Sequence, residues 1–303
     1  MAGVAPDMTI DRAGFLAGAA AGLAALAVPL RANAATTLKA RWMGGGVLEL
    51  SSADDSTIVL IDAWIWNNSG YARFGLTKPA DLASAAAYVA SIKRRAPKTF
   101  VIALTHDHGD HMGDYFELMK TLVAENVPFM SAGQSDLMRT GLIPNFKAAG
   151  LDESKLIVNN GAGINFGGSA TVGPVTLHLV PAQHSTSLGY PAAGFVIDMA
   201  GTRVYASGDT AVFGDMALIG RQFSPQLAIV CAGGGPYTMD AEGAADAVRM
   251  VGATEAIPVH YGHNPLVGGP ETGERFKAAL ARIAPNAHAT VMTPGGRATI
   301  TLG

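Results

Sequence analysis

The sequence has one cysteine and no run of basic residues longer than Lys93-Arg94-Arg95 among its 303 positions. Cys231 has no partner for an internal disulfide, and we expect it to be buried and inert because it lies in the apolar run 227–231. Phosphate binding needs clustered lysine and arginine, so the absence of a longer basic run and the net charge of -3 argue against a nucleic-acid partner. With 49% hydrophobic residues, the chain can bury a sizeable core.

The N-terminal 35 residues differ in composition from the rest. Residues 13–30 are uncharged and rich in Ala, Gly and Leu, and residues 32–34 form an Ala-Asn-Ala cleavage pattern. Residues 10–16 also resemble a twin-arginine signal in which Ala13 replaces the second arginine. We therefore predict an export signal over residues 1–35 and a periplasmic or secreted enzyme. Two alternatives stay open: a retained membrane anchor, which about 18 apolar residues barely permit, and a start codon placed upstream of a cytoplasmic enzyme.

Residues 36–303 alternate short apolar runs with segments of helical spacing. We predict strands at 38–43, 47–51, 57–61, 100–104, 128–131, 194–199, 202–206, 227–231, 255–259 and 290–293, several short strands within 156–180, and helices at 79–95, 112–122, 135–142, 241–251 and 271–283. No low-complexity linker or change in composition divides this part of the chain. The pattern predicts a single domain of layered α/β architecture.

Residues 105–111, Thr-His-Asp-His-Gly-Asp-His, hold three imidazoles and two carboxylates within seven positions. The predicted strand 100–104 ends directly before them, and the predicted helix 112–122 follows. His106 and His108 are two apart in an extended segment and so point the same way, while Asp110 is a natural N-cap for the helix. This geometry is typical of a metal site.

Three further ligand-type residues each follow an apolar run directly. They are His184 after strand 175–180, Asp209 after 204–206 and His260 after 256–259. Polar residues that gather at one edge of a sheet are where α/β folds usually build their sites. We expect these side chains to complete the site that residues 105–111 begin.

The ordered set HxHxDH, His, Asp and His resembles the metallo-β-lactamase superfamily. Residues 208–216, 237–240 and 257–261 are similar to the metal-dependent hydrolases grouped with the L-ascorbate-6-phosphate lactonases. The resemblance covers residues 38–296 and implies an α/β fold, a four-layer αββα sandwich of two mixed β-sheets flanked by helices.

The resemblance also implies a ligand set for two divalent metal ions. One ion would be held by His106, His108 and His184, the second by Asp110, His111 and His260, with Asp209 bridging both and Asp62 supporting the ligand loop. Imidazole and carboxylate ligands suit Zn²⁺ best in this reading, with Mn²⁺ or Fe²⁺ as alternatives. Such a site would hold a bridging hydroxide that attacks a lactone, ester or related carbonyl, with Asp110 orienting the hydroxide as a catalytic residue.

Four residues are candidates for contact with a small-molecule substrate. Trp64 and Trp66 either line its pocket or cover an edge of the core. Tyr261 and His263 follow the last ligand and either reach the substrate or, as their loop context favours, lie at the surface. We expect His178 and His288, which fall within strand patterns, to be structural. A membrane would be a partner only if the N-terminal segment is retained, and the sequence leaves the oligomeric state open.

Other activities of the same fold stay open as alternatives. They are a phosphodiesterase, a β-lactamase and an iron-dependent oxidoreductase, and beside these enzymes a protein that binds metal without turnover. The β-lactamase subclass with a cysteine ligand would have Cys where Asp209 stands, and the flavin-linked diiron oxidoreductases usually have Glu where His108 stands. A metallohydrolase is the function that the residues favour.

Overall fold

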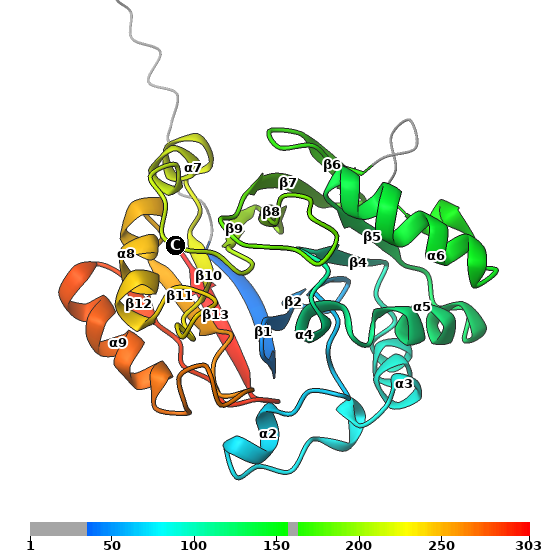
Figure 1. Ribbon diagram of the computed structural model, residues 1–303, viewed down its shortest axis with the longest axis horizontal. Coiled ribbons are helices and arrows are strands. Elements are labelled where there is room, and N and C mark those ends of the chain that lie inside the picture. Colours follow the sequence, from blue (N-terminus) through cyan, green and yellow to red (C-terminus); the bar gives the residue numbers. More distant parts are fainter. Residues whose placement is uncertain (1–34, 157–162) are drawn as a thin grey trace, which may run out of the picture. The chain divides into compact units, whose positions relative to one another are not determined.

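Two mixed β-sheets face each other across a layer of apolar side chains (Figure 1). The computed structural model describes residues 35–156 and 163–303. The first sheet has the order β13-β1-β2-β3-β4-β5, from β13 (Arg297–Leu302), β1 (Thr36–Gly44), β2 (Val47–Ser52), β3 (Thr57–Ile61), β4 (Thr99–Leu104) and β5 (Met130–Gly133). The second has the order β12-β11-β10-β9-β8-β7-β6, from β12 (His288–Ala289), β11 (Glu255–Val259), β10 (Leu227–Cys231), β9 (Thr202–Ala206), β8 (Ala193–Met199), β7 (Val175–Pro181) and β6 (Ser169–Val172).

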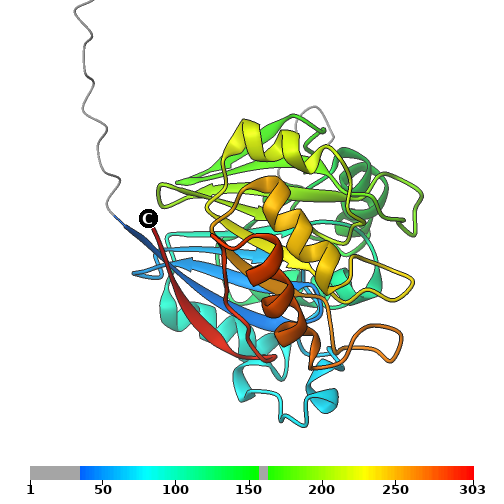
Figure 2. The same ribbon diagram turned by 90° about the vertical axis from the view of Figure 1, so that its left-hand side faces the viewer.

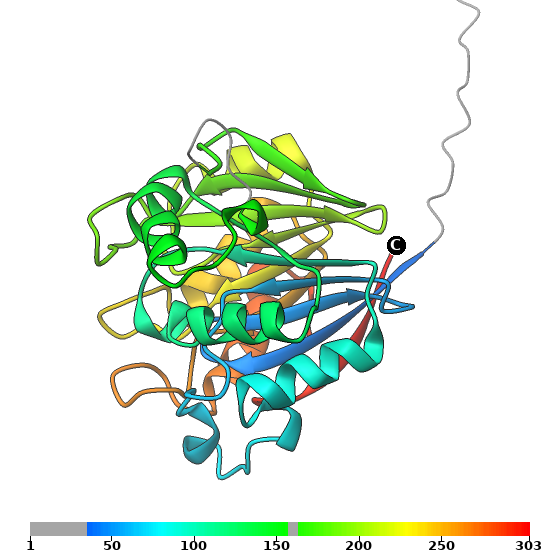
Figure 3. The same cartoon turned by 90° about the vertical axis from the view of Figure 1, so that its right-hand side faces the viewer.

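Helices cover the outer face of each sheet, as Figures 2 and 3 show from opposite sides. Side chains of α3 (Ala85–Arg95) and α5 (Tyr115–Ala124) share an apolar cluster with the first sheet. A separate cluster joins α7 (Met216–Phe223), α8 (Ala241–Val251) and α9 (Thr272–Ile283) to the second sheet. The shorter helical segments are α2 (Gly70–Arg73), η1 (Ala80–Leu82), α4 (Gly109–Met112), η2 (Leu137–Leu142), α6 (Ile143–Ala148) and η3 (Glu153–Lys155). The predicted four-layer sandwich is confirmed.

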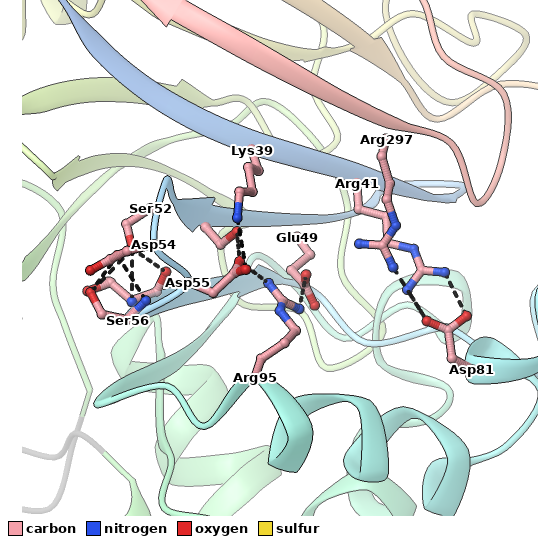
Figure 4. Close-up of polar contacts among 12 residues, drawn as sticks. Lys39, Arg41, Glu49, Ser52, Asp54, Asp55, Ser56, Asp81, Arg95 and Arg297 are labelled. Atoms are coloured by element: carbon pink, nitrogen blue, oxygen red, sulfur yellow. Dashed lines mark hydrogen bonds and ion pairs between the residues drawn. The ribbon is translucent and has the colours of Figure 1, made fainter.

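The strands near the chain start place apolar and charged residues on opposite faces of the first sheet. In β1, Leu38, Ala40 and Trp42 enter the core between the sheets, whereas Lys39 and Arg41 lie on the outer face. Figure 4 shows the ion pairs that cover this face. They join Lys39 to Asp55 at 2.8 Å, Arg95 to Glu49 at 2.6 Å and to Asp55 at 3.0 Å, and Arg41 to Asp81 at 2.7 Å.

Several element boundaries differ from the sequence prediction. The predicted strand 290–293 is wrong, because the chain crosses there from β12 in one sheet to β13 in the other. The predicted helix 79–95 is divided into η1 and α3, and α3 begins after Ser84, whose hydroxyl accepts a hydrogen bond from the Ala87 amide at 3.2 Å. The short helix α7 has no counterpart in the prediction.

The segment after the histidine motif also differs. The predicted helix 112–122 is two helices, α4 and α5, and Asp110 is not an N-cap. The His108 carbonyl already accepts hydrogen bonds from the amides of His111 and Met112, so α4 begins at Gly109 and Asp110 lies within it. Among the described residues, no helix combines the length and apolar character needed to cross a membrane. The predicted export signal in residues 1–35 lies outside the described residues except for Ala35.

Candidate metal centre

The seven predicted ligands come together at one edge of the two sheets. His106 and His108 follow β4, with Asp110 and His111 in α4 directly behind them. The other three ligands follow strands of the second sheet: His184 follows β7, Asp209 follows β9 and His260 follows β11. Because β9 and β11 both run parallel to β10, they end at the same edge. Strand ends of both sheets thus supply the candidate ligands.

The first group of candidate ligands consists of His106, His108 and His184. The Nε2 atom of His106 lies 3.0 Å from Nδ1 of His108, and Nε2 of His184 lies 3.3 Å from that same Nδ1. The ligand atoms of this group are within 4.8 Å of one another. Three imidazoles at this spacing are a donor set that suits Zn²⁺ or a similar divalent ion.

The second group consists of Asp110, His111 and His260, again with ligand atoms within 4.8 Å of one another. Asp209 lies between the two groups. Its Oδ1 is 3.3 Å from Nε2 of His111, while its Oδ2 is 2.9 Å from Nε2 of His260 and 3.7 Å from Nε2 of His184. A carboxylate that faces both groups has the geometry of a bridging ligand.

Buried polar atoms in this cluster lack hydrogen-bond partners among the described residues. They include Nε2 of His111, Nε2 of His260 and Oδ1 of Asp209. Buried polar groups in folded proteins nearly always have a partner, and the desolvation of one left without costs about 1–3 kcal/mol. These atoms converge, and all are metal-ligating types, so the residues fit a metal-ion site.

The electrostatics of the cluster favour metal binding. Burial lowers the pKa of His106 and of His184, which keeps both rings neutral and able to ligate. Burial opposes ionisation of Asp209, but His260 and His111 lower its pKa well below the usual range. Against the effect of burial, Asp209 raises the pKa of His260 to about 9 and also raises that of His111. Metal binding would therefore release protons from these two histidines.

Asp62 holds His111 from the side opposite the candidate ion. Its Oδ2 accepts a hydrogen bond from Nδ1 of His111 at 2.7 Å and from the Thr105 hydroxyl at 2.8 Å, and its Oδ1 accepts one from the Thr105 amide at 2.8 Å. With Nδ1 as the donor to Asp62, Nε2 of His111 is the nitrogen that would release its proton and offer its lone pair to a metal ion. The structure places Asp62 where the sequence analysis expects a supporting residue.

A hollow of about 620 Å³ opens above the ligands. Trp64, Ser69, Ser185, Tyr237, His263 and Asn264 line it beside His108, Gly109, Asp110, His184, Asp209 and His260. The side chain of Asp110 is 30% exposed, so its carboxylate is accessible from the hollow. None of the described residues in this lining is lysine or arginine.

Comparison with known proteins agrees with this geometry. Residues 57–261 match the family model described as the β-lactamase superfamily domain. The chain belongs to this superfamily. It is 31% identical over 257 residues to a "UPF0173 metal-dependent hydrolase" of Hyperthermus butylicus, covering 84% of this chain and 96% of the relative. A protein of the same description from Archaeoglobus fulgidus is also 31% identical, over 268 residues, with 85% and 97% covered.

A solved structure shows the same superfamily architecture. Igni18, described as a metallo hydrolase from Ignicoccus hospitalis, superposes with a TM-score of 0.66 at 27% identity, covering 88% of this chain and 99% of Igni18. The predicted membership of the metallo-β-lactamase superfamily is thus confirmed, and the chain is a metal-dependent hydrolase of that fold. The more specific resemblance to lactonases stays a prediction.

Two of the four predicted substrate residues line the hollow, and the other two do not. Trp64 and His263 line the hollow, and His263 is buried rather than at the surface position that its loop context favours. Trp66 is absent from the lining and donates its indole hydrogen to Glu117 at 3.0 Å. Tyr261 is also absent, and it is buried rather than at the favoured surface position, because its ring packs against the buried Trp42 at a centroid distance of 4.7 Å.

Several residues of the hollow were not predicted from the sequence. Tyr237 is 41% exposed in the lining, and Ser69, Ser185 and Asn264 accompany it. All four lie on loops between elements, where no periodic pattern indicates which way a side chain points. None of the four is a ligand-type residue directly after a strand, and Tyr237 lies in the segment 237–240 that supports the family resemblance but suggests no role for its side chain.

Proposed function

We propose that the protein is a dinuclear metal-dependent hydrolase that cleaves a neutral lactone, ester or related carbonyl compound. His106, His108 and His184 would hold one divalent ion and Asp110, His111 and His260 the other, with Asp209 shared between them. Zn²⁺ is the ion that this donor set suits best, with Mn²⁺ or Fe²⁺ as alternatives.

One observation carries the two-ion proposal. The carboxylate of Asp209 lies within 3.7 Å of a histidine from each group, with Oδ1 beside His111 and Oδ2 beside His260 and His184. A site for a single ion would leave one set of buried histidines without a function, and burying uncompensated polar groups is costly. The names of the relatives, metal-dependent hydrolases, support hydrolysis as the reaction.

When bound, two ions supply a hydroxide nucleophile at neutral pH and stabilise the charge that develops on the carbonyl oxygen. The carboxylate of Asp110 would transfer the proton in this reaction. Its partly exposed carboxylate lies at the floor of the hollow, and the neighbouring His260 and His263 keep its pKa low despite burial, so it is present as an acceptor. In hydrolysis a C–O bond forms between the hydroxide and the carbonyl carbon, and the C–O bond to the leaving group breaks. Asp110 would accept the proton that the attacking oxygen still carries and pass it to the leaving oxygen.

The lining of the hollow favours an uncharged substrate. Trp64 and Tyr237 offer two aromatic surfaces, and the described lining contains no lysine or arginine to neutralise a phosphate. Lys78 is directed elsewhere, since its ammonium donates to the Trp66 carbonyl and lies 5.3 Å from the centre of the Tyr71 ring. A phosphorylated sugar lactone would find no lysine or arginine partner for its phosphate in the described lining of this hollow.

The test is turnover by protein reconstituted with Zn²⁺, Mn²⁺ or Fe²⁺ on matched panels of neutral lactones, aryl and alkyl esters, and phosphodiesters. We expect hydrolysis of a neutral carbonyl substrate, removed by chelators and by the His108→Ala substitution. Equal activity in His108→Ala would contradict the assignment of the site. Hydrolysis of phosphodiesters alone, or oxygen consumption by the iron-loaded protein without hydrolysis, would contradict the proposed reaction.

A further inference from the structure

His263 is a buried histidine beside the candidate ligands that belongs to none of their groups. Its side chain is 1% exposed, and its Nε2 lies 3.3 Å from Oδ2 of Asp110. The same carboxylate oxygen lies 3.4 Å from Nε2 of His260. Within the described part of the chain, His263 is not among the residues whose ligand atoms converge on a common point.

The local structure fixes the position of His263. The preceding Gly262 has φ of +71°, and a Cβ there would lie 2.2 Å from the Phe74 ring, so only glycine fits this turn. The Ser69 hydroxyl donates a hydrogen bond to the His263 carbonyl at 2.8 Å. The imidazole packs edge-on against Trp64, with ring centres 5.9 Å apart. Three separate contacts therefore place one ring against Asp110.

Asp110 needs such a neighbour more than the other ligands do. It lies in the four-residue helix α4, and its side chain is 30% exposed, whereas His111 and His260 are almost fully buried. A partly exposed carboxylate in a short helix has several accessible rotamers. In any rotamer that points away from His111 and His260, Asp110 cannot bind the same metal ion as these two histidines. Neither ring nitrogen of His263 has a hydrogen-bond partner among the described residues, so the 3.3 Å approach of its Nε2 to Oδ2 of Asp110 is an ion-pair contact rather than a hydrogen bond.

We propose that His263 is a positioning residue for Asp110. Its Nε2–H contacts Oδ2 and restricts the carboxylate to the rotamer that faces His111 and His260, which raises the affinity of this group for its ion. Residues that orient metal ligands in this way typically contribute 10- to 100-fold to metal affinity. The inference rests on the proposed function only in requiring that the Asp110 group binds a metal ion.

The experiment titrates the metal-free protein with Co²⁺ in competition with a chromophoric chelator and follows the d–d absorption of each bound equivalent. His263→Phe keeps a ring beside Trp64 but removes the donor, while His263→Gln can place an amide N–H near the position of Nε2. His178→Phe is the matched control, because His178 lies in β7 against Phe223, at a ring distance of 4.9 Å. His263→Asn, whose shorter amide does not reach Asp110, makes the same comparison if the phenylalanine variant fails to fold.

We expect His263→Phe to bind one Co²⁺ as the wild type does and the other about 10- to 100-fold more weakly. We expect His263→Gln to recover most of that affinity and His178→Phe to match the wild type. Unchanged affinities in both donor-free variants would overturn the proposal. Complete loss of one equivalent in the phenylalanine and glutamine variants alike would also overturn it, since His263 would then be a ligand itself. Wild-type protein that binds two ions without hydrolysing any substrate refutes the proposed reaction but leaves this metal-affinity result interpretable.

Discussion

Replacing Asp62 by asparagine tests how the chain prepares His111 for a metal ion. Asp62 is 1% exposed and accepts three hydrogen bonds, two from Thr105 and one from Nδ1 of His111. Its φ of +59° lies in the left-handed region, which asparagine also tolerates, so the backbone is not strained by the change. Asparagine keeps one oxygen for the Thr105 amide and places its NH₂ group toward His111.

The magnitude follows from the contacts that the substitution removes. Nδ1 of His111 loses a charged acceptor at 2.7 Å, and hydrogen bonds to charged groups contribute about 1.5–3 kcal/mol each. We expect the free energy of unfolding of the metal-free protein to fall by about that amount. The NH₂ group also favours the tautomer in which Nε2 of His111 carries the hydrogen, and this tautomer cannot ligate an ion. Metal affinity should fall about 10- to 100-fold, equivalent to about 1.4–2.8 kcal/mol.

Two measurements separate the effects. Urea unfolding of the metal-free protein, followed by circular dichroism, gives the stability change, and chelator competition gives the metal affinity. Asp246→Asn is the matched control, because Asp246 is a partly exposed residue of α8 that pairs with Arg249. We expect the control to change stability by less than about 0.5 kcal/mol and metal affinity not at all.

Two results would refute this reasoning. Wild-type metal affinity in Asp62→Asn would show that the Asp62 contact does not set the His111 tautomer. A loss of stability no larger than that of Asp246→Asn would show that the buried hydrogen bonds of Asp62 contribute little to folding. A loss of affinity without a loss of stability would support the tautomer argument and reject the estimate for the hydrogen bonds.

Three further predictions concern other parts of the chain. In Gly46→Ala, the new Cβ would lie 2.3 Å from the His111 ring, so we expect weaker metal binding by chelator competition with unchanged circular dichroism. Cys231 is 1% exposed and burial raises its pKa to about 12, so we expect a thiol-reactive disulfide reagent at pH 8 to label it only after unfolding; rapid labelling of folded protein would contradict this. Asp81→Asn removes the carboxylate that accepts a hydrogen bond from each terminal nitrogen of the buried Arg41 guanidinium, and urea unfolding should show that the free energy of unfolding falls by about 3 kcal/mol. A fall of less than about 1 kcal/mol would show that this ion pair contributes no more than an ordinary surface pair.

The positions of the candidate ligands were predictable because they follow from local rules. His184, Asp209 and His260 each come directly after an apolar run, and the direction of a strand determines which sheet edge its last residue reaches. We can therefore place a ligand-type residue that follows a strand at that edge without knowing how distant segments pack. The burial of β10 was predictable for the same reason, because it is a continuous apolar run, which is typical of a strand that pairs in parallel on both sides.

The walls of the hollow depend on contacts between distant segments. His263 is buried because Gly262 turns the chain against Phe74, a residue nearly 190 positions earlier, and because the Ser69 hydroxyl binds its carbonyl. The predicted strand 290–293 failed in a similar way. Its residues have strand-like composition, but the chain passes there from the second sheet to the first, so only β12 and β13 on either side form ladders.

Asp107 and Asp110, the two carboxylates of the histidine motif, have different roles because the backbone is extended at one and helical at the other. His106 and His108 alternate with Asp107 in extended chain, so the histidines point to one side and Asp107 to the other. On that other side, Asp107 accepts hydrogen bonds from the amides of Ser187 and Leu188 at 2.7 and 3.0 Å. These amides lie three and four residues after His184, so the motif that supplies two ligands of the first group also anchors the loop that carries the third. Asp110 lies beyond this extended stretch, in α4, where the helical turn directs its carboxylate to His260 instead.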